Sequence, residues 1–262
     1  MANTGRTVSK YNRLYLGNGT TGLDLSCNTM SVGKAGIDYD FDDTAAYCWS
    51  VKGGLLDQGN LTLGPINMSI DTATASTGAV IHDDLAAING GPIVAALAVG
   101  IRELPVIGSP CFCFEGSLKS YVSSPAGGMV MATATFVADN PAAAPLKYAQ
   151  PWGVVLHPLG AETAANASTA DVVDNGAATT NGGYVLLVVT DIAVDGAPAI
   201  FIEESADGTT YTPLTGASIS PTSEGAWIAQ VAPGTTIKQF TRWQFDPDGA
   251  SAATFFMAFV RG

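Results

Sequence analysis

The sequence predicts a mainly β protein: a β-sandwich or barrel-type domain with one short flanking helix, followed by a second all-β sandwich domain. Hydrophobic residues make up 47% of the 262 residues and charged residues only 13%, about half the usual share. Ala, Gly, Thr and Ser fill the difference, and Thr- and Gly-rich chains favour strands and turns over helices. Most apolar residues also fall in short alternating or β-branched runs bounded by Gly.

The length is sufficient for two domains, each with its own core. We predict a first domain over residues 1–160, a linker over 161–183 and a second domain over 184–262. Residues 1–160 hold 8 basic and 12 acidic residues (net −4), and the remainder holds 3 and 11 (net −8). The more acidic second domain is therefore expected to face solvent.

In chain order, the stretch from Tyr11 to Ile70 reads as strands joined by turns, interrupted by an acidic loop with the sequence GIDYDFDD. Residues 78–99 are the one convincing helical stretch, with Asp83 and Asp84 in its first turn, where carboxylates suit the helix dipole. The Gly-Gly-Pro sequence at 90–92 limits this helix to about two turns.

Strands resume with SPCFCFEGSLKSYVSS and with MVMATATFVA, whose alternation predicts a sheet with two unlike faces. Residues 139–183 are rich in Ala, Pro, Asn, Gly and Thr, and we expect a single short strand there, near Val154. The second all-β unit begins at about Tyr184.

The sequence contains no complete motif for catalysis or cofactor binding. GNGTTG at 17–22 has the letters of a dinucleotide-binding loop, with Asp40 or Asp42 about twenty residues on, but a strand-like sequence follows where a helix is required. Ser residues lack a nucleophile-elbow setting, and the chain has only two His residues. Glu203 and Glu204 are adjacent on a strand and point to opposite faces, so they cannot flank one glycosidic bond. We expect no enzyme activity and no cofactor.

Metal sites are likewise not predicted. The acidic sequence at 38–43 resembles half a calcium loop, but Asp43 and Trp49 stand where Gly and Glu are needed. Cys111 and Cys113 share one face of a strand without the partners that zinc requires. With no apolar run long enough for a signal peptide or a membrane span, we expect cytoplasmic synthesis. The four cysteines are then expected to be reduced and partly buried: Cys27, Cys48, Cys111 and Cys113.

The formal charge of −12 argues against nucleic-acid binding by phosphate neutralisation, and the 11 basic residues are scattered. An acidic wall, however, would repel DNA and let it slide past.

Two sets of segments resemble known phage proteins. In the last eighty residues, ESADGTTYTPL and the closing FTRWQF…ATFFMAFVRG resemble a sandwich module of bacteriophage structural proteins. Residues 11–160 resemble the major tail protein (tail tube protein) of long-tailed phages, through LDLSCNTMSVG, GIDYDFDDTAAYCW, KGGLLDQGNLTLGPI, a short helix near 83–97, LKSYVSSPAGGMVMATATFVADN and PWGVVLHPLG. The chain departs from the family pattern where Gly and Pro interrupt the helix.

The resemblance implies a virion protein, synthesised in the host bacterial cytoplasm, that assembles with itself into stacked hexameric rings and contacts other tail proteins. Genomic DNA would pass through the ring without specific binding, and the chain would not insert into a membrane. A loop carrying Asp38, Asp40, Asp42 and Asp43 would bridge one ring to the next. The second domain would be an immunoglobulin-like or jelly-roll-like decoration. MVMATATFV and YVLLVVTDI lack Lys, so we expect them to be strands that are covered in the assembly.

Two alternatives remain open from the sequence. The chain could be a head-decoration or fibre protein of a phage virion. It could also be a carbohydrate-binding or host-surface-binding β-sandwich protein, in which three aromatic residues form a stacking platform. Those residues are Tyr211, Trp227 and Trp243; packing within the strand core is the competing interpretation.

Overall fold

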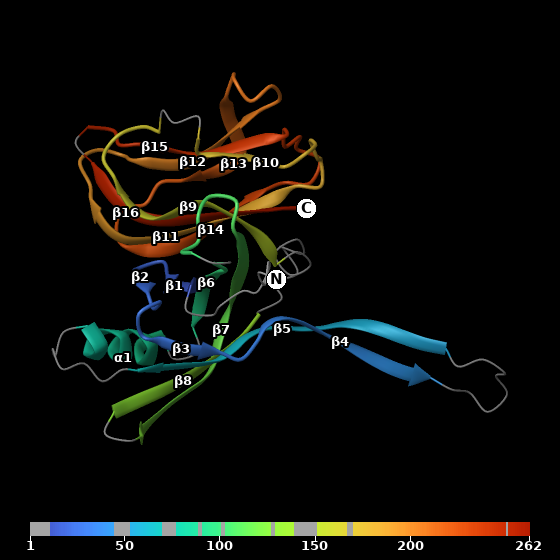
Figure 1. The fold of residues 1–262 in the computed structure, drawn as a ribbon, viewed down its shortest axis with the longest axis vertical. Helices are drawn as coiled ribbons and strands as arrows, with labels where there is room; N and C mark the ends of the chain where they lie inside the picture. Colours follow the sequence, from blue (N-terminus) through green and yellow to red (C-terminus); the bar gives the residue numbers. More distant parts are fainter. Residues whose placement is uncertain are drawn as a thin grey trace, which may run out of the picture.

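A computed structural model describes residues 11–44, 53–69, 77–88, 91–100, 103–126, 129–138, 151–166, 170–249 and 251–262. These residues form sheet layers stacked one on another, with a separate apolar core between neighbouring layers (Figure 1). The predicted mainly β class is confirmed. Among the described residues, no helix has the length and apolar character needed to span a membrane.

The first layer, which we call the arm sheet, is built around one long central strand. It contains β3 (Thr29–Val32), β4 (Ala35–Thr44), β5 (Gly53–Ser69), β8 (Met129–Val137) and the second half of β7 (Pro110–Ala126). β5 pairs with β3 and β4 along one edge and with β8 along the other, and β8 pairs in turn with β7. The helix α1 (Thr77–Ile88) lies beside this sheet and buries Leu85 in the adjoining core.

The second layer lies on the inner face of the arm sheet. Its strands are β1 (Arg13–Asn18), β2 (Thr21–Asp24), β6 (Pro92–Ala98) and the first half of β7. Between the two layers is the helix-side core, which contains Leu14, Leu63, Phe112, Phe114 and Phe136. β6 is buried along almost its whole length, which is the environment that favours a continuous apolar run such as PIVAALA.

The third layer continues from the second within one twelve-stranded sheet. Its strands are β9 (Trp152–Glu162), β16 (Ala252–Arg261), β11 (Gly183–Ala193) and β14 (Gly225–Val231). β9 makes the connection, because it pairs with β7 at residues 110–112 and with β16. A middle core fills the space between the second and third layers, where the rings of Tyr15 and Phe256 stack 4.2 Å apart.

The fourth layer is a separate four-stranded sheet that completes a sandwich with the third. It consists of β10 (Val172–Asp174), β15 (Phe240–Asp246), β12 (Ala199–Ser205) and β13 (Thr212–Ile219). The sandwich core between these two layers contains Trp243, Phe245, Phe255 and Phe259. In the chain, β9 belongs to the predicted first domain, yet its Leu156 lies in the sandwich core.

Several predicted elements differ from the structure. α1 runs over Thr77–Ile88, three turns rather than about two, so Asp83 and Asp84 lie in its second half and not in its first turn. Pro92–Ala98, expected as the end of the helix, is strand β6. An apolar run this short has no periodicity that distinguishes a buried strand from a buried helix.

Two further differences concern the sheets. Residues 139–183 hold the eleven-residue β9 and the short β10 rather than a single short strand. β8 and β11, expected to be covered by other copies, each pair with two strands of the same chain. Their lack of Lys therefore reflects central positions within one subunit.

Candidate functional site

The candidate functional site is a two-stranded ribbon that leaves the body of the molecule (Figure 1). We call it the arm: residues 39–44 of β4 paired with residues 53–58 of β5, from Tyr39 opposite Gln58 to Thr44 opposite Gly53. β8 reaches β5 only as far as Thr62, and no described strand pairs with the outer side of β4. Within the described chain, both outer edges of the arm therefore lack a strand partner.

The four aspartates predicted to join rings lie in β4 rather than in a loop. They are Asp38, Asp40, Asp42 and Asp43. In GIDYDFDD the acidic residues alternate with Ile37, Tyr39 and Phe41, which is the period-two pattern of a strand. The acidic composition concealed that signal. Their side chains lie outside the described part of the structure, so the inter-ring role stays a prediction.

Hydrogen bonds fix the arm sheet to the rest of the subunit. His82 Nδ1 lies 2.8 Å from the hydroxyl of Tyr121, which ties α1 to β7. At the other side, Asn28 Nδ2 donates to the carbonyl of Ser69 at 3.0 Å, and the Ser69 amide donates to the Asn28 carbonyl at 2.9 Å. Both contacts lie at the end of the arm sheet away from the arm, where β5 ends at Ser69.

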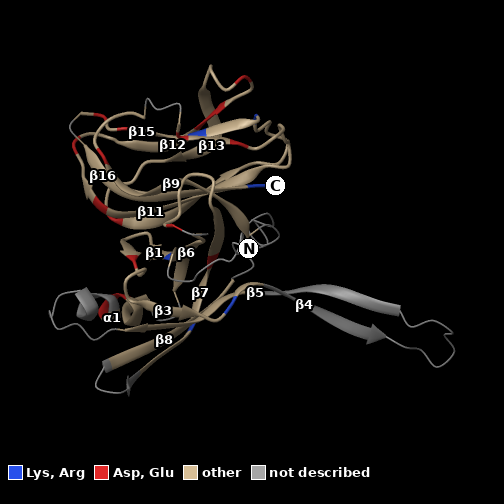
Figure 2. Ribbon diagram, in the orientation of Figure 1, with Lys and Arg blue, Asp and Glu red and all other residues tan. Residues whose placement is uncertain are grey.

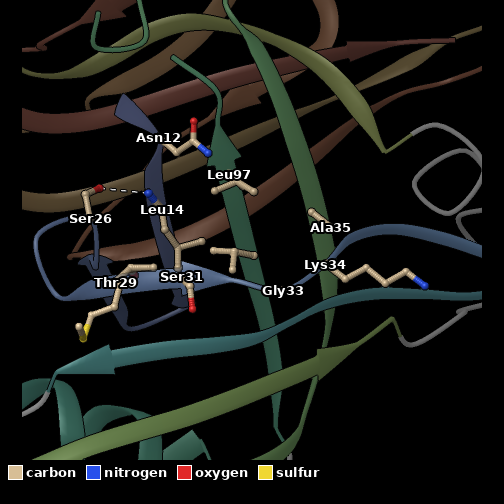
Figure 3. Close-up of a pocket in the computed structure, with 11 residues that line it drawn as sticks. Asn12, Leu14, Ser26, Thr29, Ser31, Gly33, Lys34, Ala35 and Leu97 are labelled. Atoms are coloured by element: carbon tan, nitrogen blue, oxygen red, sulfur yellow. Dashed lines mark hydrogen bonds between the residues drawn. The ribbon is translucent and has the colours of Figure 1, made fainter. Parts of the chain in front are cut away.

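A cavity of about 410 Å³ opens at the base of the arm, between β1 and the β3–β4 connection (Figure 3). Ser26, Thr29 and Ser31 give it hydroxyl groups, and Leu14 and Leu97 give it an apolar floor. Ser26 Oγ accepts a hydrogen bond from the Leu14 amide at 3.0 Å. Figure 3 shows Lys34 pointing away from the other lining residues.

The second half of β7 forms the opposite edge of the arm sheet. β6 pairs with β7 only as far as Ser117, opposite Pro92, whereas β8 continues along residues 117–126. Beyond Ser117, one edge of β7 thus has no strand partner among the described residues. Val122 on this edge is 60% exposed.

The two adjacent glutamates of the sandwich, Glu203 and Glu204, each form an ion pair with a basic side chain. Arg242 donates from Nε and Nη2 to Glu203 Oε2 at 2.9 and 2.7 Å, and its guanidinium lies 4.1 Å from the ring centre of Tyr211. Glu204 accepts from the Lys238 amide at 2.9 Å and lies 3.5 Å from its ammonium. Both contacts are structural ion pairs of the four-stranded sheet.

The three aromatic residues of the predicted stacking platform do not form one surface. Trp243 is 4% exposed and lies in the sandwich core, with its ring edge-on to His157 and Phe255. Trp227 packs partly buried on the same core from β14. Tyr211 lies on the other sheet of the sandwich, just before β13, with the guanidinium of Arg242 from β15 over its ring. Trp243 has no face available to a sugar.

His157 is a buried titratable group within the sandwich. Its Nδ1 lies 3.0 Å from the Phe255 carbonyl and its Nε2 lies 3.1 Å from Glu162 Oε1. Burial lowers the pKa of His157, and the hydrogen bonds to Glu162 and Phe255 oppose this only in part. A neutral imidazole has a single N–H, so it donates to one of these two acceptors.

The cysteines follow the prediction only in part. Cys111 and Cys113 are fully buried thiols whose sulfurs lie 3.8 Å apart, and burial raises the pKa of Cys111. Cys27 is an exposed thiol, because it lies in the turn after β2. Cys48 lies outside the described residues. No group of three or more potential metal-ligating side chains occurs in the described part of the chain.

Among the residues that Figure 2 colours, charge differs between the layers. Figure 2 shows acidic positions mainly along the strands and loops of the sandwich, whereas β8 of the arm sheet carries no charged position.

The comparisons with known proteins give weak structural likeness only. No protein-family model matches the sequence, and no curated protein matches it either. One similar solved chain is the Dit protein of phage SPP1, described as a paradigm of the hub adsorption apparatus in phages that infect Gram-positive bacteria. It is 11% identical with a TM-score of 0.33, covering 94% of this chain and 98% of that chain.

Two other similar chains come from the phage p2 baseplate in its activated conformation. The chain from the structure with calcium is 8% identical with a TM-score of 0.36, and the one from the structure with strontium is 7% identical with a TM-score of 0.34. Each match covers 96% of this chain and 98% of the other. Similarity at this level assigns neither a function nor a partner.

Proposed function

We propose that the chain is a non-enzymatic structural protein of a phage virion, which assembles with copies of itself into rings that stack as a tail tube. The single observation that carries the assembly is the arm. A ribbon of two strands is at best marginally stable in water on its own, and both of its outer edges lack a strand partner in the described chain. Such an element gains its stability by lying against another molecule.

The arrangement favours a ring of identical copies. The arm and the unpaired edge of β7 lie at opposite edges of the same sheet, so a contact that joins the arm side of one copy to the β7 side of the next is head-to-tail. A head-to-tail contact closes into a ring when the rotation between copies allows it. Closure also removes sheet edges that an isolated protein must protect.

The resemblance of residues 11–160 to tail tube proteins supplies the finer part of the proposal. It supports six copies in each ring, stacking through the part of the chain that includes Asp38 to Asp43, and passage of genomic DNA through the ring. In this proposal the sandwich decorates the outside of the tube, and other tail proteins contact its ends.

The test removes the arm without disturbing its base. Ile37 and Leu61 are cross-strand partners, so an Asn-Gly turn that replaces residues 38–60 closes the ribbon as a short hairpin. The wild-type chain is expected to form rings or tubes with a central channel by negative-stain electron microscopy. The shortened chain is expected to remain folded by circular dichroism and to be monomeric by mass photometry.

A second variant changes only residues 45–52, which lie between the two strands of the arm in the chain. Thr44 and Gly53 are also partners, so an Asn-Gly turn in place of residues 45–52 keeps the paired arm intact. Single rings that persist after removal of the whole arm would limit the arm to stacking and overturn its role within a ring, and long tubes that persist would overturn both roles. Wild-type monomers or trimers that bind phage heads would favour a decoration or fibre protein instead.

A further inference from the structure

The described part of the chain contains the sequence Asn-Gly at Asn18, Asn175 and Asn181. An asparagine followed by glycine is prone to lose its side-chain amide, because the next backbone nitrogen attacks the side-chain carbonyl carbon and glycine has no side chain to hinder the approach. The fold holds these three asparagines in different ways, so their reactivity is expected to differ in the folded chain.

Asn18 lies at the end of β1, in the turn that leads into β2. Its Oδ1 accepts hydrogen bonds from the backbone amide and from the hydroxyl of Thr20, both at 3.0 Å. Gly19 is exposed, and no atom lies within 4 Å of a Cβ added to it. Among the described residues, neither Nδ2 of Asn18 nor the backbone amide of Gly19 has a hydrogen-bond partner. The leaving group and the attacking atom are therefore both free to react.

These contacts suit attack by the Gly19 nitrogen on Cγ of Asn18. As the N–Cγ bond forms, the nitrogen gives its proton to water and negative charge develops on Oδ1, where the N–H and O–H donors of Thr20 already lie. The Cγ–Nδ2 bond then breaks, and Nδ2 leaves as ammonia with the formation of a succinimide ring. Water opens this ring at either carbonyl and gives aspartate or isoaspartate, so the reaction consumes one water and releases one ammonia.

Asn175 is held in the opposite way. Its Nδ2 donates to the Thr241 hydroxyl at 3.1 Å and to a neighbouring main-chain carbonyl at 2.9 Å. The attacking nitrogen is also engaged, because the Gly176 amide donates to Asp174 Oδ1 at 2.8 Å. The side chain of Asn181 is exposed, with neither the donors of Asn18 nor the restraints of Asn175 in the described structure. Asn181 therefore serves as an unrestrained reference.

We propose that Asn18 is a site of spontaneous deamidation in the folded subunit, and that its isoaspartate product loosens the contact between the second and third layers. The turn fits closely against β14: a Cβ added to Gly225 would lie 3.0 Å from the Asn18 carbonyl oxygen, and one added to Gly17 would lie 2.9 Å from Ala226 Cβ. Isoaspartate lengthens the main chain by one CH₂ at this point, so the fit is lost. The reaction needs only a folded subunit and is independent of the proposed ring.

The test follows the three asparagines in the full-length chain, incubated in mildly alkaline buffer either folded or unfolded in urea. Digestion at acid pH and mass spectrometry with fragmentation locate each replacement of NH₂ by OH, and isotopically labelled water marks the oxygen that enters. In the folded chain, Asn18 is expected to react faster than Asn181, and Asn175 more slowly than both. In urea the three rates should become similar, because only the shared Asn-Gly sequence then remains.

Two threonine variants test the role of the donors at Oδ1. Thr20→Val keeps the branched shape and removes one donor, so it is expected to slow the reaction at Asn18 by about two- to tenfold, the factor for a single hydrogen bond. Thr21→Val is the matched control, because the Thr21 hydroxyl has no hydrogen-bond partner among the described residues. It should leave the rate at Asn18 unchanged. Circular dichroism verifies that both variants are folded.

The effect on the layers is measured by urea denaturation. Asn18→Asp adds the charge of the product without lengthening the main chain, so its urea midpoint should stay close to that of fresh wild-type protein. Aged wild-type protein, with its isoaspartate quantified by enzymatic methylation, should unfold at lower urea. Equal midpoints for aged and fresh protein, or for aged protein and Asn18→Asp, would overturn the proposed loosening.

The site itself is tested by the rates. A folded-state rate at Asn18 no higher than at Asn175 or Asn181 would show that the fold does not promote the reaction there. A Thr20→Val variant that reacts as fast as the wild type, or faster, would show that the bonds to Oδ1 do not assist the attack. Either result would overturn the assignment of Asn18 as a modification site.

Discussion

At the scale of single residues, the sandwich holds glutamates that are largely withdrawn from solvent and paired with basic side chains. The side chains of Arg242 and Glu203 are 15% and 14% exposed, and Arg242 meets one carboxylate oxygen with two N–H groups. His157 is enclosed by Trp243 and Phe255. The adjacency of Glu203 and Glu204 was visible in the sequence, but their cations were not, because Arg242 and Lys238 reach them across strands thirty-four or more positions away.

Glu203→Gln is expected to lower the free energy of unfolding by about 2 kcal/mol, because it leaves the Arg242 charge partly buried without its carboxylate. Urea denaturation measures the change. Glu224→Gln is the matched control at an exposed position, and it should shift stability by less than about 0.5 kcal/mol. In a double-mutant cycle with Arg242→Met, the two changes should be strongly non-additive; additive effects would show that the pair contributes nothing.

The pKa of His157 makes stability depend on pH in a defined direction. Burial lowers this pKa below the ordinary value of 6.5, so below that pH the unfolded chain binds a proton that the folded chain resists. Stability from this residue is therefore present above about pH 6.5 and is lost as pH falls toward the folded-state pKa. The urea midpoint should decrease over that range.

The chain's only other histidine provides the control for this pH dependence. His157→Gln should flatten the decrease below pH 6.5, whereas His82→Gln should keep it, whatever its effect on absolute stability. An unchanged slope in His157→Gln would show that His157 does not cause the decrease.

At the scale of elements, strands were predictable where alternation was clear and composition agreed with it. The alternation in MVMATATFV placed Ala132, Ala134 and Phe136 on one face, and all three are buried. β4 was missed because its aspartates suggested a loop, although they alternate with apolar residues. β6 was missed because both of its faces are buried, so its sequence has no period to distinguish strand from helix.

Contact between the second and third layers depends on a glycine in β2. A Cβ added to Gly22 would lie 2.0 Å from the Val189 carbonyl oxygen of β11 and 2.9 Å from that of Gly225. Because both are backbone atoms, the layers must move apart. Gly22→Ala is expected to cost more than about 3 kcal/mol of stability.

Gly36→Ala is the matched control for Gly22→Ala, because no atom lies within 4 Å of an added Cβ at Gly36. It should leave the urea midpoint unchanged or raise it slightly. A Gly22→Ala variant as stable as Gly36→Ala would contradict the close approach of β2 to β11.

At the scale of the whole molecule, the sheet order was not accessible from the sequence. β9 lies between β7 and β16, which are separated from each other by more than 120 positions in the chain, and no local pattern encodes such pairing. The Ala-, Asn- and Thr-rich composition before β11 indicated a linker between two units. In the structure, however, Tyr15 and Ala96 from the first part share the middle core with Tyr184 and Phe256 from the second.

The shared middle core predicts that the two parts unfold together. Separating them would expose a layer of large apolar side chains on each side, which include Val94, Tyr184, Leu186, Phe256 and Val260. Scanning calorimetry of the arm-shortened monomer should therefore give one transition, with equal calorimetric and van't Hoff enthalpies. A fragment of residues 151–262, which keeps every strand of the sandwich, should still aggregate or bind apolar dyes, because it bares one side of the middle core. Two separate transitions, or a soluble and compact fragment, would show that the parts are independent domains and that the middle core is a weak contact between them.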